Sequence, residues 1–379
     1  MENINIFSFF AGAGFLDLGF ETTNHYNIVY VNEFFKPFNE IYKYAREIMG
    51  IKPPVYGYNV GDINDLLNDN NLSTLKELVN KSKQNNITGM IGGPPCPDFS
   101  IAGHNKGEEG ENGRLSKSYN ELICKTHPDF FLFENVKGLY RTAKHREFFE
   151  RMKQSFIDNG YYLTEQLTNS IEFGVPQDRD RIILIGFSKE LVCKLKLPFE
   201  GNQILNFPWE KFKVHSRNIM NDLPWPTTEP YVEDDKKAMP QGIIKELTVQ
   251  YWWDKNDVEN HPNGKMYFKP KQGLIKFKSF DEGDCKRKSG KRLHRWRYSP
   301  TAAYGNNEVH IHPFKPRRIS VAESLAIQSL PKEFVIPPTM TLSNAFKTIG
   351  NGVPFLLAQG VAKSIYEFLN KYCYGDKPF

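Results

Sequence analysis

The first half of the chain alternates short apolar runs with stretches in which apolar residues recur at helical spacing. The runs at 4–10, 27–31 and 130–133 predict buried strands. The stretches at 15–21 and 143–157 predict helices, because their apolar residues fall on one face. Alternating strands and helices of this kind predict an α/β fold.

This pattern ends after about Phe187, where proline-rich turns and short β-like pieces replace the strand-helix units. Helical spacing returns near the C-terminus and predicts a last helix from Phe355 to Tyr372. A chain of 379 residues exceeds what one core usually holds, which favours two domains or one domain with an insertion. We therefore predict one domain from residues 1–189 and 319–379, with a second, irregular domain at 190–318.

Basic charge is concentrated in the predicted second domain. From His261 to Arg318 there are 15 Lys and Arg against 4 Asp and Glu, a balance of +11, whereas the whole chain carries +5. Residues 286–288 and 291–298 interleave these cations with aromatic rings, as a surface that binds phosphates and contacts bases would. A solvated run of charge is the ordinary alternative.

The five cysteines are too few and too scattered for a disulfide framework, and none forms a C-x-x-C pair that suggests zinc. The N-terminal apolar run has Glu2 where a secretory signal would be basic, and glycines interrupt it. No stretch approaches the roughly 18 apolar residues that a membrane span needs. We expect a cytoplasmic protein with no membrane partner and no metal site.

Cys96 has the most distinctive setting of the five cysteines. It follows the apolar run 88–91 and stands among Pro94, Pro95 and Pro97, which predict a stiff turn at the end of a strand. Open α/β sheets build their sites at that edge, so the thiol is a candidate nucleophile. A small buried side chain, as most free cysteines are, is an equally good interpretation of this stretch alone.

Three carboxylates accompany a glycine turn at 11–14, which joins the first strand to the first helix as in nucleotide-binding folds. Asp17 replaces the third glycine of a dinucleotide motif; it would repel a pyrophosphate but could accept from an ammonium group, so an adenosyl amino acid fits better than NAD. Glu33 suits the two hydroxyls of a cofactor ribose. Asp62 could accept from an adenine amino group, or could cap a helix instead.

A second group of polar residues surrounds the next predicted strands. Glu134 ends a buried strand near apolar walls, which suits it to donate a proton at neutral pH. Arg179 and Arg181 point the same way if a strand begins there. The glycine-rich segment 103–114 is predicted to be a surface loop beside Cys96, either a lid or a disordered insert.

Eight motifs stand in the order found in the cytosine-C5 DNA methyltransferases, which the chain resembles over nearly its whole length apart from about 190–295. They are Phe10 to Gly14, Asn32-Glu33, Gly61 to Ile63, Pro94 to Cys96, Glu134 to Val136, Gln177 to Arg181, Arg318 to Pro331 and Gly350 to Val353. The resemblance implies a Rossmann-like, S-adenosylmethionine-dependent methyltransferase domain. It also implies a smaller, irregular, β-rich target-recognition domain inserted before the C-terminal helix.

The same resemblance implies roles for individual residues. The catalytic set would be Cys96, Glu134, Asn135, Arg179 and Arg181, with Glu134 at N3 of the base and the arginines at O2. The cofactor would be bound by Phe10, Ala11, Gly12, Gly14, Phe15, Glu33, Phe34, Asp62, Ile63, Pro95, Asn351 and Gly352, with Phe34 stacked on adenine. DNA would be contacted by Ser100, Arg114, Lys291, Arg292, Arg295, Arg297 and Thr301.

The chemistry explains why these residue types are needed together. Cytosine C5 does not take a methyl group unaided, so a thiolate must add at C6, and the base must leave the duplex to be reached. A thiol of ordinary pKa is about 3% ionised at pH 7, so complete ionisation supplies only about 2 kcal/mol. Enzymes supply about 8 kcal/mol or more, so a proton or hydrogen bond to N3 must contribute the larger share.

We therefore predict a sequence-specific DNA (cytosine-5-)-methyltransferase that acts as a monomer on double-stranded DNA, in a restriction-modification system with a separate endonuclease. Two alternatives remain open. A tRNA cytosine-C5 methyltransferase could use the same scaffold, although its typical Cys-Phe-Thr signature is absent. A catalytically silent DNA-binding homologue is less compatible with an intact Cys96, Glu134 and Arg181 set.

Overall fold

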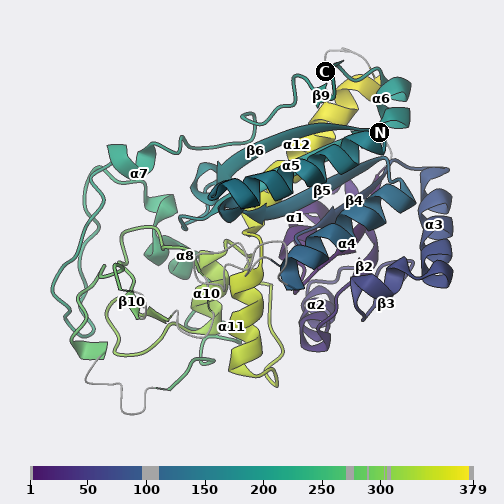
Figure 1. The fold of residues 1–379 in the computed structure, drawn as a ribbon. Helices are drawn as coiled ribbons and strands as arrows, with labels where there is room; N and C mark the ends of the chain where they lie inside the picture. Colours follow the sequence, from purple (N-terminus) through teal and green to yellow (C-terminus); the bar gives the residue numbers. More distant parts are fainter. Residues whose placement is uncertain are drawn as a thin grey trace.

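The computed structural model describes residues 3–95, 111–269, 277–287, 290–302, 304 and 309–374. Within them, a nine-stranded sheet forms the centre of the molecule, in the order β3-β2-β1-β4-β5-β7-β6-β9-β8 (Figure 1). The strands are β1 (Ile4–Phe9), β2 (Tyr26–Asn32), β3 (Tyr58–Asn59), β4 (Thr88–Gly92), β5 (Phe130–Val136), β6 (Tyr161–Asn169), β7 (Asp180–Ser188), β8 (Phe199–Glu200) and β9 (Gln203–Ile204). The α/β prediction is confirmed.

The direction of the strands changes within this sheet. From β3 to β5 every neighbouring pair is parallel, whereas β7 is antiparallel to both β5 and β6. Strands β9 and β8 lie beyond the predicted domain boundary at residue 190 and still extend the edge of the central sheet. The boundary itself stays a prediction.

Helices cover both faces of the sheet, which explains why its strands are nearly continuous apolar runs. Apolar residues of α3, α4 and α5 pack on one face, and those of α1, α6 and α12 pack on the other (Figure 1). The helices of this part are α1 (Phe15–Glu21), α2 (Lys36–Ile48), α3 (Asp69–Lys83), α4 (Glu111–Thr126), α5 (Ala143–Asp158), α6 (Lys189–Leu195) and α12 (Phe355–Tyr374). Three short 3₁₀ helices join them, η1 (Ile63–Leu67), η4 (Lys137–Tyr140) and η5 (Ser170–Phe173).

The last helix packs directly on the first. A side chain on Gly19 of α1 would come 2.5 Å from Cβ of Ala358 on α12, so only glycine allows this approach. The Tyr26 hydroxyl donates to the Ala362 carbonyl at 2.7 Å. The C-terminal helix therefore completes the layer that begins at the N-terminus.

The segment between β9 and α12 has a different character. Its described residues contain one small sheet, in which β10 (Lys291–Arg292) pairs with β11 (His310–Ile311). The segment is irregular, as predicted, but poor in strands, whereas the sequence predicts a β-rich domain. Its helical elements are α7 (Ile219–Asp222), η6 (Lys245–Leu247), α8 (Val249–Lys255), α10 (Val321–Ile327) and α11 (Leu342–Asn351).

Buried polar contacts take the place of a sheet in holding this segment together. The Arg317 guanidinium pairs with Glu323 at 2.7 Å, and Glu323 also caps α10 by accepting from the Ser320 N–H at 2.6 Å. The Trp253 indole donates to the Glu323 carbonyl at 3.0 Å. These bonds tie α8 to α10 and so to the C-terminal part of the chain.

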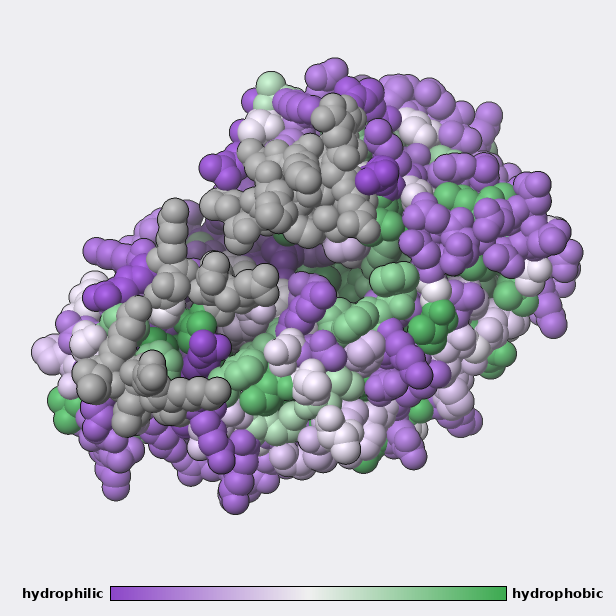
Figure 2. Space-filling view, turned by 60° about the horizontal axis from the view of Figure 1, so that its bottom comes forward, coloured by the Kyte–Doolittle hydropathy of each residue, from purple (hydrophilic) through white to green (hydrophobic). Residues whose placement is uncertain are grey.

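One further property concerns the surface. Figure 2 shows hydrophobic residues gathered in the middle of one face and hydrophilic residues around them. In the part of the chain that the structure describes, no helix is both long and apolar enough to cross a bilayer.

Candidate active site

The glycine turn after β1 is held in left-handed backbone conformations. Phe10 has φ +52°, Gly12 φ +58° and Gly14 φ +78°. A Cβ on Gly14 would lie 2.4 Å from the Tyr42 ring and 2.6 Å from the Arg46 guanidinium, so this position requires glycine. On Gly12 such a Cβ would have one neighbour within 4 Å among the described residues, Oγ1 of Thr348 at 3.9 Å, so these residues leave that side of the turn open.

Glu33 at the end of β2 is bonded to this turn. Its carboxylate accepts from the Gly12 N–H and from the Phe35 N–H, both at 2.8 Å. Burial raises the pKa of Glu33, while these two hydrogen bonds and the nearby Lys347 lower it. The structure therefore places Glu33, the residue predicted to bind the cofactor ribose, against the glycine turn.

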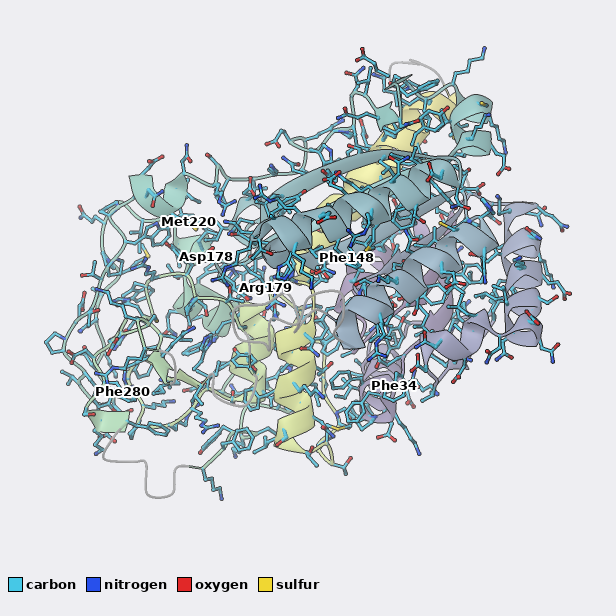
Figure 3. The ribbon with its side chains drawn as sticks, in the orientation of Figure 1. Phe34, Phe148, Asp178, Arg179, Met220 and Phe280 are labelled. Carbon is cyan, nitrogen blue, oxygen red and sulfur yellow. The ribbon has the colours of Figure 1, made fainter. Side chains whose placement is uncertain are left out.

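Asp62 and Phe34 lie at the same edge of the sheet. The Asp62 carboxylate accepts from the Asn64 N–H at 2.9 Å and caps η1, so the helix-cap interpretation of this residue is confirmed. Phe34, just before α2, is 68% exposed, and Figure 3 shows it at the periphery of the molecule. A large aromatic side chain left this exposed is available for stacking.

The surroundings of Asp17 contradict its predicted role, which was to accept from an ammonium group of the cofactor. Its side chain is fully buried, and its two oxygens accept from the Ser8 hydroxyl at 2.8 Å and the Tyr42 hydroxyl at 2.9 Å. Burial raises the pKa of Asp17 to about 6, although the Arg46 guanidinium opposes this shift. The carboxylate lies beneath the glycine turn, bonded to protein groups, and is not placed to accept from a cofactor ammonium group.

The segment that leads to Cys96 passes against Glu134. Strands β4 and β5 are parallel neighbours, with Gly92 opposite Phe133, and a Cβ on Gly93 would lie 2.5 Å from Glu134 Oε2. Pro95 follows two residues later and is the last described residue of this segment. Cys96 and Ser100 lie outside the described residues, so their roles stay predictions.

Arg181 pairs with Glu134 across two antiparallel strands. In the register of β5 and β7, Arg181 lies opposite Val136, which places it diagonal to Glu134 on the same face. The Arg181 Nε atom lies 2.5 Å from Glu134 Oε1, and both side chains are about nine-tenths buried. The carboxylate therefore meets a cation as well as the apolar walls that the sequence suggested.

Arg179 has a structural role that the sequence does not predict. It is 2% exposed and donates to the carbonyls of Ala302 at 2.9 Å and Gly350 at 2.8 Å. Burial lowers its pKa. Both outer nitrogens donate to backbone carbonyls, whereas the buried Nε has no hydrogen-bond partner among the described residues, so the contact of Arg179 with the base stays a prediction. The Thr301 hydroxyl likewise donates inward, to the Asp178 carbonyl at 2.7 Å.

Two arginines of the basic segment are also buried. Arg292 is fully buried and donates to the carbonyl of Phe280 at 2.7 Å, and to those of Phe277 and His312. Arg295 is 3% exposed and binds the buried carboxylate of Glu282 at 2.9 Å. This burial contradicts the prediction that either one contacts DNA. Lys291 and Arg297 are half-buried and Arg114 is exposed, so their DNA contacts stay predictions.

Helix α11 adds residues that the motifs do not single out. Thr348 is 2% exposed, and its hydroxyl faces Gly12 without a hydrogen-bond partner in the part of the chain that the structure describes. The Lys347 ammonium lies 5.2 Å from the centre of the Phe35 ring. Both precede Asn351 by about one helical turn, and this spacing is the signal that could have identified them. Gly352 packs under the Phe15 ring, where a Cβ would come within 2.2 Å.

Asn135 is the remaining member of the predicted catalytic set. Its Oδ1 accepts from the Val136 N–H at 2.8 Å, while its amide nitrogen is buried without a partner in the described residues. Buried donors in folded proteins are usually hydrogen-bonded, so this amide nitrogen is a candidate for a contact with a neighbouring segment or a ligand.

Comparison with known protein families identifies the family of this chain. The model of the C-5 cytosine-specific DNA methylase family matches residues 4–367. The chain belongs to this family. Membership confirms the resemblance found in the motifs and the predicted enzyme class, a DNA cytosine-C5 methyltransferase. Methylases of this family use S-adenosylmethionine as the methyl donor.

Individual methylases resemble the chain over most of its length. It is 58% identical to the Type II methyltransferase M.NmeDI of Neisseria meningitidis serogroup C, over 97% of this chain and 84% of that one. It is 29% identical to M.MthTI of Methanothermobacter thermautotrophicus, over 96% and 97%.

Solved structures support the fold of the methylase. One, described as a DNA modification methyltransferase encoded within an E. coli prophage, has a TM-score of 0.64 at 22% identity and covers 97% of this chain and 100% of its own. A variant of the Spodoptera frugiperda protein DNMT2 has a TM-score of 0.58 at 16% identity, covering 96% and 100%. At these identities the comparison shows the fold alone.

The methyl donor of the family fits the residues present. The Thr348 hydroxyl, which has no hydrogen-bond partner among the described residues, and the open side of Gly12 face the same space. A buried polar group without a protein partner is a candidate for a hydrogen bond to a ligand. Glu33 offers carboxylate oxygens beside this turn, and Phe34 offers an exposed ring. Together they suit a molecule with an amino acid at one end and an adenosine at the other.

Proposed function

We propose that this protein methylates C5 of a cytosine that is flipped out of double-stranded DNA, through a covalent bond between Cys96 and C6 of the base. The observation that carries the proposal is the contact of Gly93 with Glu134, which is itself paired with Arg181. It supports a site in which a nucleophile three residues after Gly93 shares a pocket with an acid and a guanidinium.

The residues would divide the work as follows. The Cys96 thiolate would add to C6 of the cytosine, and C5 would then take the methyl group from the sulfonium of S-adenosylmethionine. A base would remove the C5 proton, and the electrons of that C–H bond would restore the C5=C6 double bond and expel the Cys96 thiolate. Glu134, in its protonated form, would donate to N3 and Arg181 would donate to O2, which makes the ring more electrophilic. The buried amide nitrogen of Asn135, which has no partner among the described residues, would donate to a carbonyl of the Cys96 segment, or the Asn135 Oδ1 would accept from the exocyclic amine of the base.

The cofactor would be held by residues at the carboxyl ends of β1, β2 and β4. S-adenosylmethionine supplies, when bound, a methyl group activated on a sulfonium. Glu33 would accept from the ribose hydroxyls and Phe34 would stack on the adenine. The other residues proposed to line this site are Phe10, Ala11, Gly12, Gly14, Phe15, Asp62, Ile63, Pro95, Asn351 and Gly352.

The substrate would be recognised by the segment 190–318, which we propose as the target-recognition domain. Arg114, Lys291 and Arg297 would provide phosphate or base contacts. The 58% identity to a Type II methyltransferase supports a place in a restriction-modification system, with a separate endonuclease. One chain would act on each target cytosine.

Transfer of a labelled methyl group from S-adenosylmethionine tests this function. Duplex DNA should accept the label, and tRNA should not. Cys96→Ala should still bind DNA but transfer no methyl group, whereas Cys193→Ala, which removes an exposed cysteine on α6, should be as active as the wild type. Methyl incorporation by Cys96→Ala above background would exclude Cys96 as the nucleophile.

A second measurement identifies the product. After expression in a host that lacks DNA methylation, sequencing for 5-methylcytosine should show modification at one short recognition sequence. Methyl transfer to tRNA instead of DNA would favour the RNA alternative. Binding to DNA without any transfer would favour the catalytically silent one.

A further inference from the structure

Arg46 is a buried cation that the proposed chemistry does not use. It lies on α2 and is 2% exposed, yet its guanidinium reaches beneath the glycine turn. It donates to the carbonyl of Ala13 at 3.2 Å and to that of Gly14 at 2.8 Å. Its Nη2 atom also pairs with Glu21 at 2.9 Å, at the end of α1. One side chain thus joins α2, the turn and α1.

Tyr42 links this arginine to a second buried group. The Arg46 guanidinium carbon lies 3.8 Å from the centre of the Tyr42 ring. The Tyr42 hydroxyl donates to Asp17, which in turn accepts from Ser8 on β1. A continuous polar chain therefore runs under the turn from β1 through α1 to α2.

Burial of these charges has a cost that packing alone does not explain. A guanidinium removed from water loses several kcal/mol of hydration, and an apolar side chain of similar size would often fill such a space with less loss. Here the loss is offset by Glu21, Asp17 and two carbonyls of the turn. The fork of an arginine is suited to binding both carbonyls at once, which fixes the position and the plane of the turn.

We propose that Arg46 is a positioning residue for the cofactor site. By holding the carbonyls of Ala13 and Gly14 from below, it presents the open side of Gly12 to the cofactor at a fixed distance from Glu33. This inference rests on the proposed function, because it takes the cofactor to be S-adenosylmethionine. It concerns affinity for the cofactor and not the chemical step.

Binding of S-adenosylhomocysteine, measured by calorimetry, tests the proposal without any methyl transfer. Arg46→Met should weaken binding by at least about tenfold, which corresponds to the loss of hydrogen bonds made by a charged group. In turnover, the KM for S-adenosylmethionine should rise, while kcat and the KM for DNA should change little. Arg46→Lys should recover part of the affinity, because an ammonium reaches one carbonyl but lacks the planar fork.

Arg292→Met is the matched control, since Arg292 is an equally buried arginine that binds carbonyls far along the chain. It should keep wild-type affinity for S-adenosylhomocysteine. Wild-type affinity in Arg46→Met, or an equal loss in both variants, would overturn the proposal.

Two further outcomes are distinguishable. If Arg46→Met does not fold, wild-type affinity in Arg46→Lys overturns the proposal equally. If the wild-type protein binds neither S-adenosylhomocysteine nor S-adenosylmethionine, the proposed function fails first, and this inference fails with it.

Discussion

The guanidinium of Arg181 meets the carboxylate of Glu134 at 2.5 Å, from positions diagonal to each other on antiparallel strands β7 and β5. Both side chains are largely withdrawn from water, so each depends on the other for compensation of its charge. The pair also lies next to the segment that leads to Cys96, because Gly93 contacts Glu134. A substitution in either residue therefore tests chemistry and stability together.

Glu134→Gln should slow methyl transfer by about a hundredfold, the size of effect typical of a group that moves a proton or hydrogen bond to the reacting atoms. Affinity for S-adenosylhomocysteine should remain nearly that of the wild type, because Glu134 pairs with Arg181 and lies against Gly93, away from the glycine turn at 11–14. Single-turnover rates and calorimetry would separate the two effects. A large loss of cofactor affinity would instead assign Glu134 to the cofactor site.

Arg181→Met should lower the free energy of unfolding by about 3 kcal/mol, since it leaves a largely buried carboxylate without its cation. The double variant Arg181→Met/Glu134→Gln should recover part of this loss, because neither charge then remains. Urea unfolding of the four proteins gives the coupling energy. Equal, additive losses would show that the ion pair does not hold the two strands together.

Arg292→Met should destabilise the protein by about 2–4 kcal/mol, because the buried carbonyls that Arg292 binds lose their donor. Arg287→Ala provides the contrast: this arginine is half exposed, pairs with Asp284, and should change stability by less than about 0.5 kcal/mol. Urea unfolding is the measurement. DNA affinity that falls in Arg292→Met without any loss of stability would restore the DNA contact predicted from the sequence.

Asp17 should make stability depend on pH. Burial raises the pKa of Asp17 from 3.8 to about 6, so the folded protein keeps this proton over a range in which the unfolded chain loses it. Its contribution is complete below about pH 4 and is lost as the pH rises through 6, by about 3 kcal/mol in all. The difference in unfolding free energy between wild type and Asp17→Asn should fall by most of that amount from pH 4 to 7.

The control for this titration is Asp65→Asn, which removes a carboxylate from an exposed position on η1. Its difference from the wild type should stay constant over the same range. A flat difference for Asp17→Asn as well would mean that the buried carboxylate does not change protonation between pH 4 and 7.

Phe34→Ala should weaken binding of S-adenosylhomocysteine by roughly tenfold, as expected for the loss of one aromatic stack on a base. Stability should hardly change, because the ring is 68% exposed. Val55→Ala removes an equally exposed apolar side chain and should leave both quantities unchanged. Normal affinity in Phe34→Ala would remove the stacking role.

The strands and the last helix could be predicted because burial on both faces leaves a local record in sequence. The apolar run 130–133 lies in β5, and the helix predicted at 355–372 is α12. The order of strands could not be predicted in this way. Nothing local in 180–188 shows that β7 runs antiparallel between β5 and β6, because that depends on partners far along the chain.

The distribution of charge in the sequence predicted the roles of residues less well than the apolar pattern predicted the strands and helices. In the sequence, each basic residue from Lys291 to Arg297 is an equal candidate for DNA binding. In the structure, Arg292 is buried and donates to carbonyls, and Arg295 is buried and binds Glu282. An irregular segment with few β-ladders leaves backbone carbonyls without N–H donors, and the long basic side chains donate to these carbonyls instead. The sequence alone does not distinguish an arginine that donates to buried backbone carbonyls from one that binds a phosphate at the surface.

The contact between α1 and α12 has a consequence for synthesis of the protein. The apolar face that Gly19 and Phe20 present stays uncovered on the ribosome until the codons for Ala358 and its neighbours have been read. Folding of the cofactor layer is thus coupled to synthesis of α12. A truncated polypeptide that ends before residue 355 should be an aggregation-prone product, and a separately supplied C-terminal fragment should restore it.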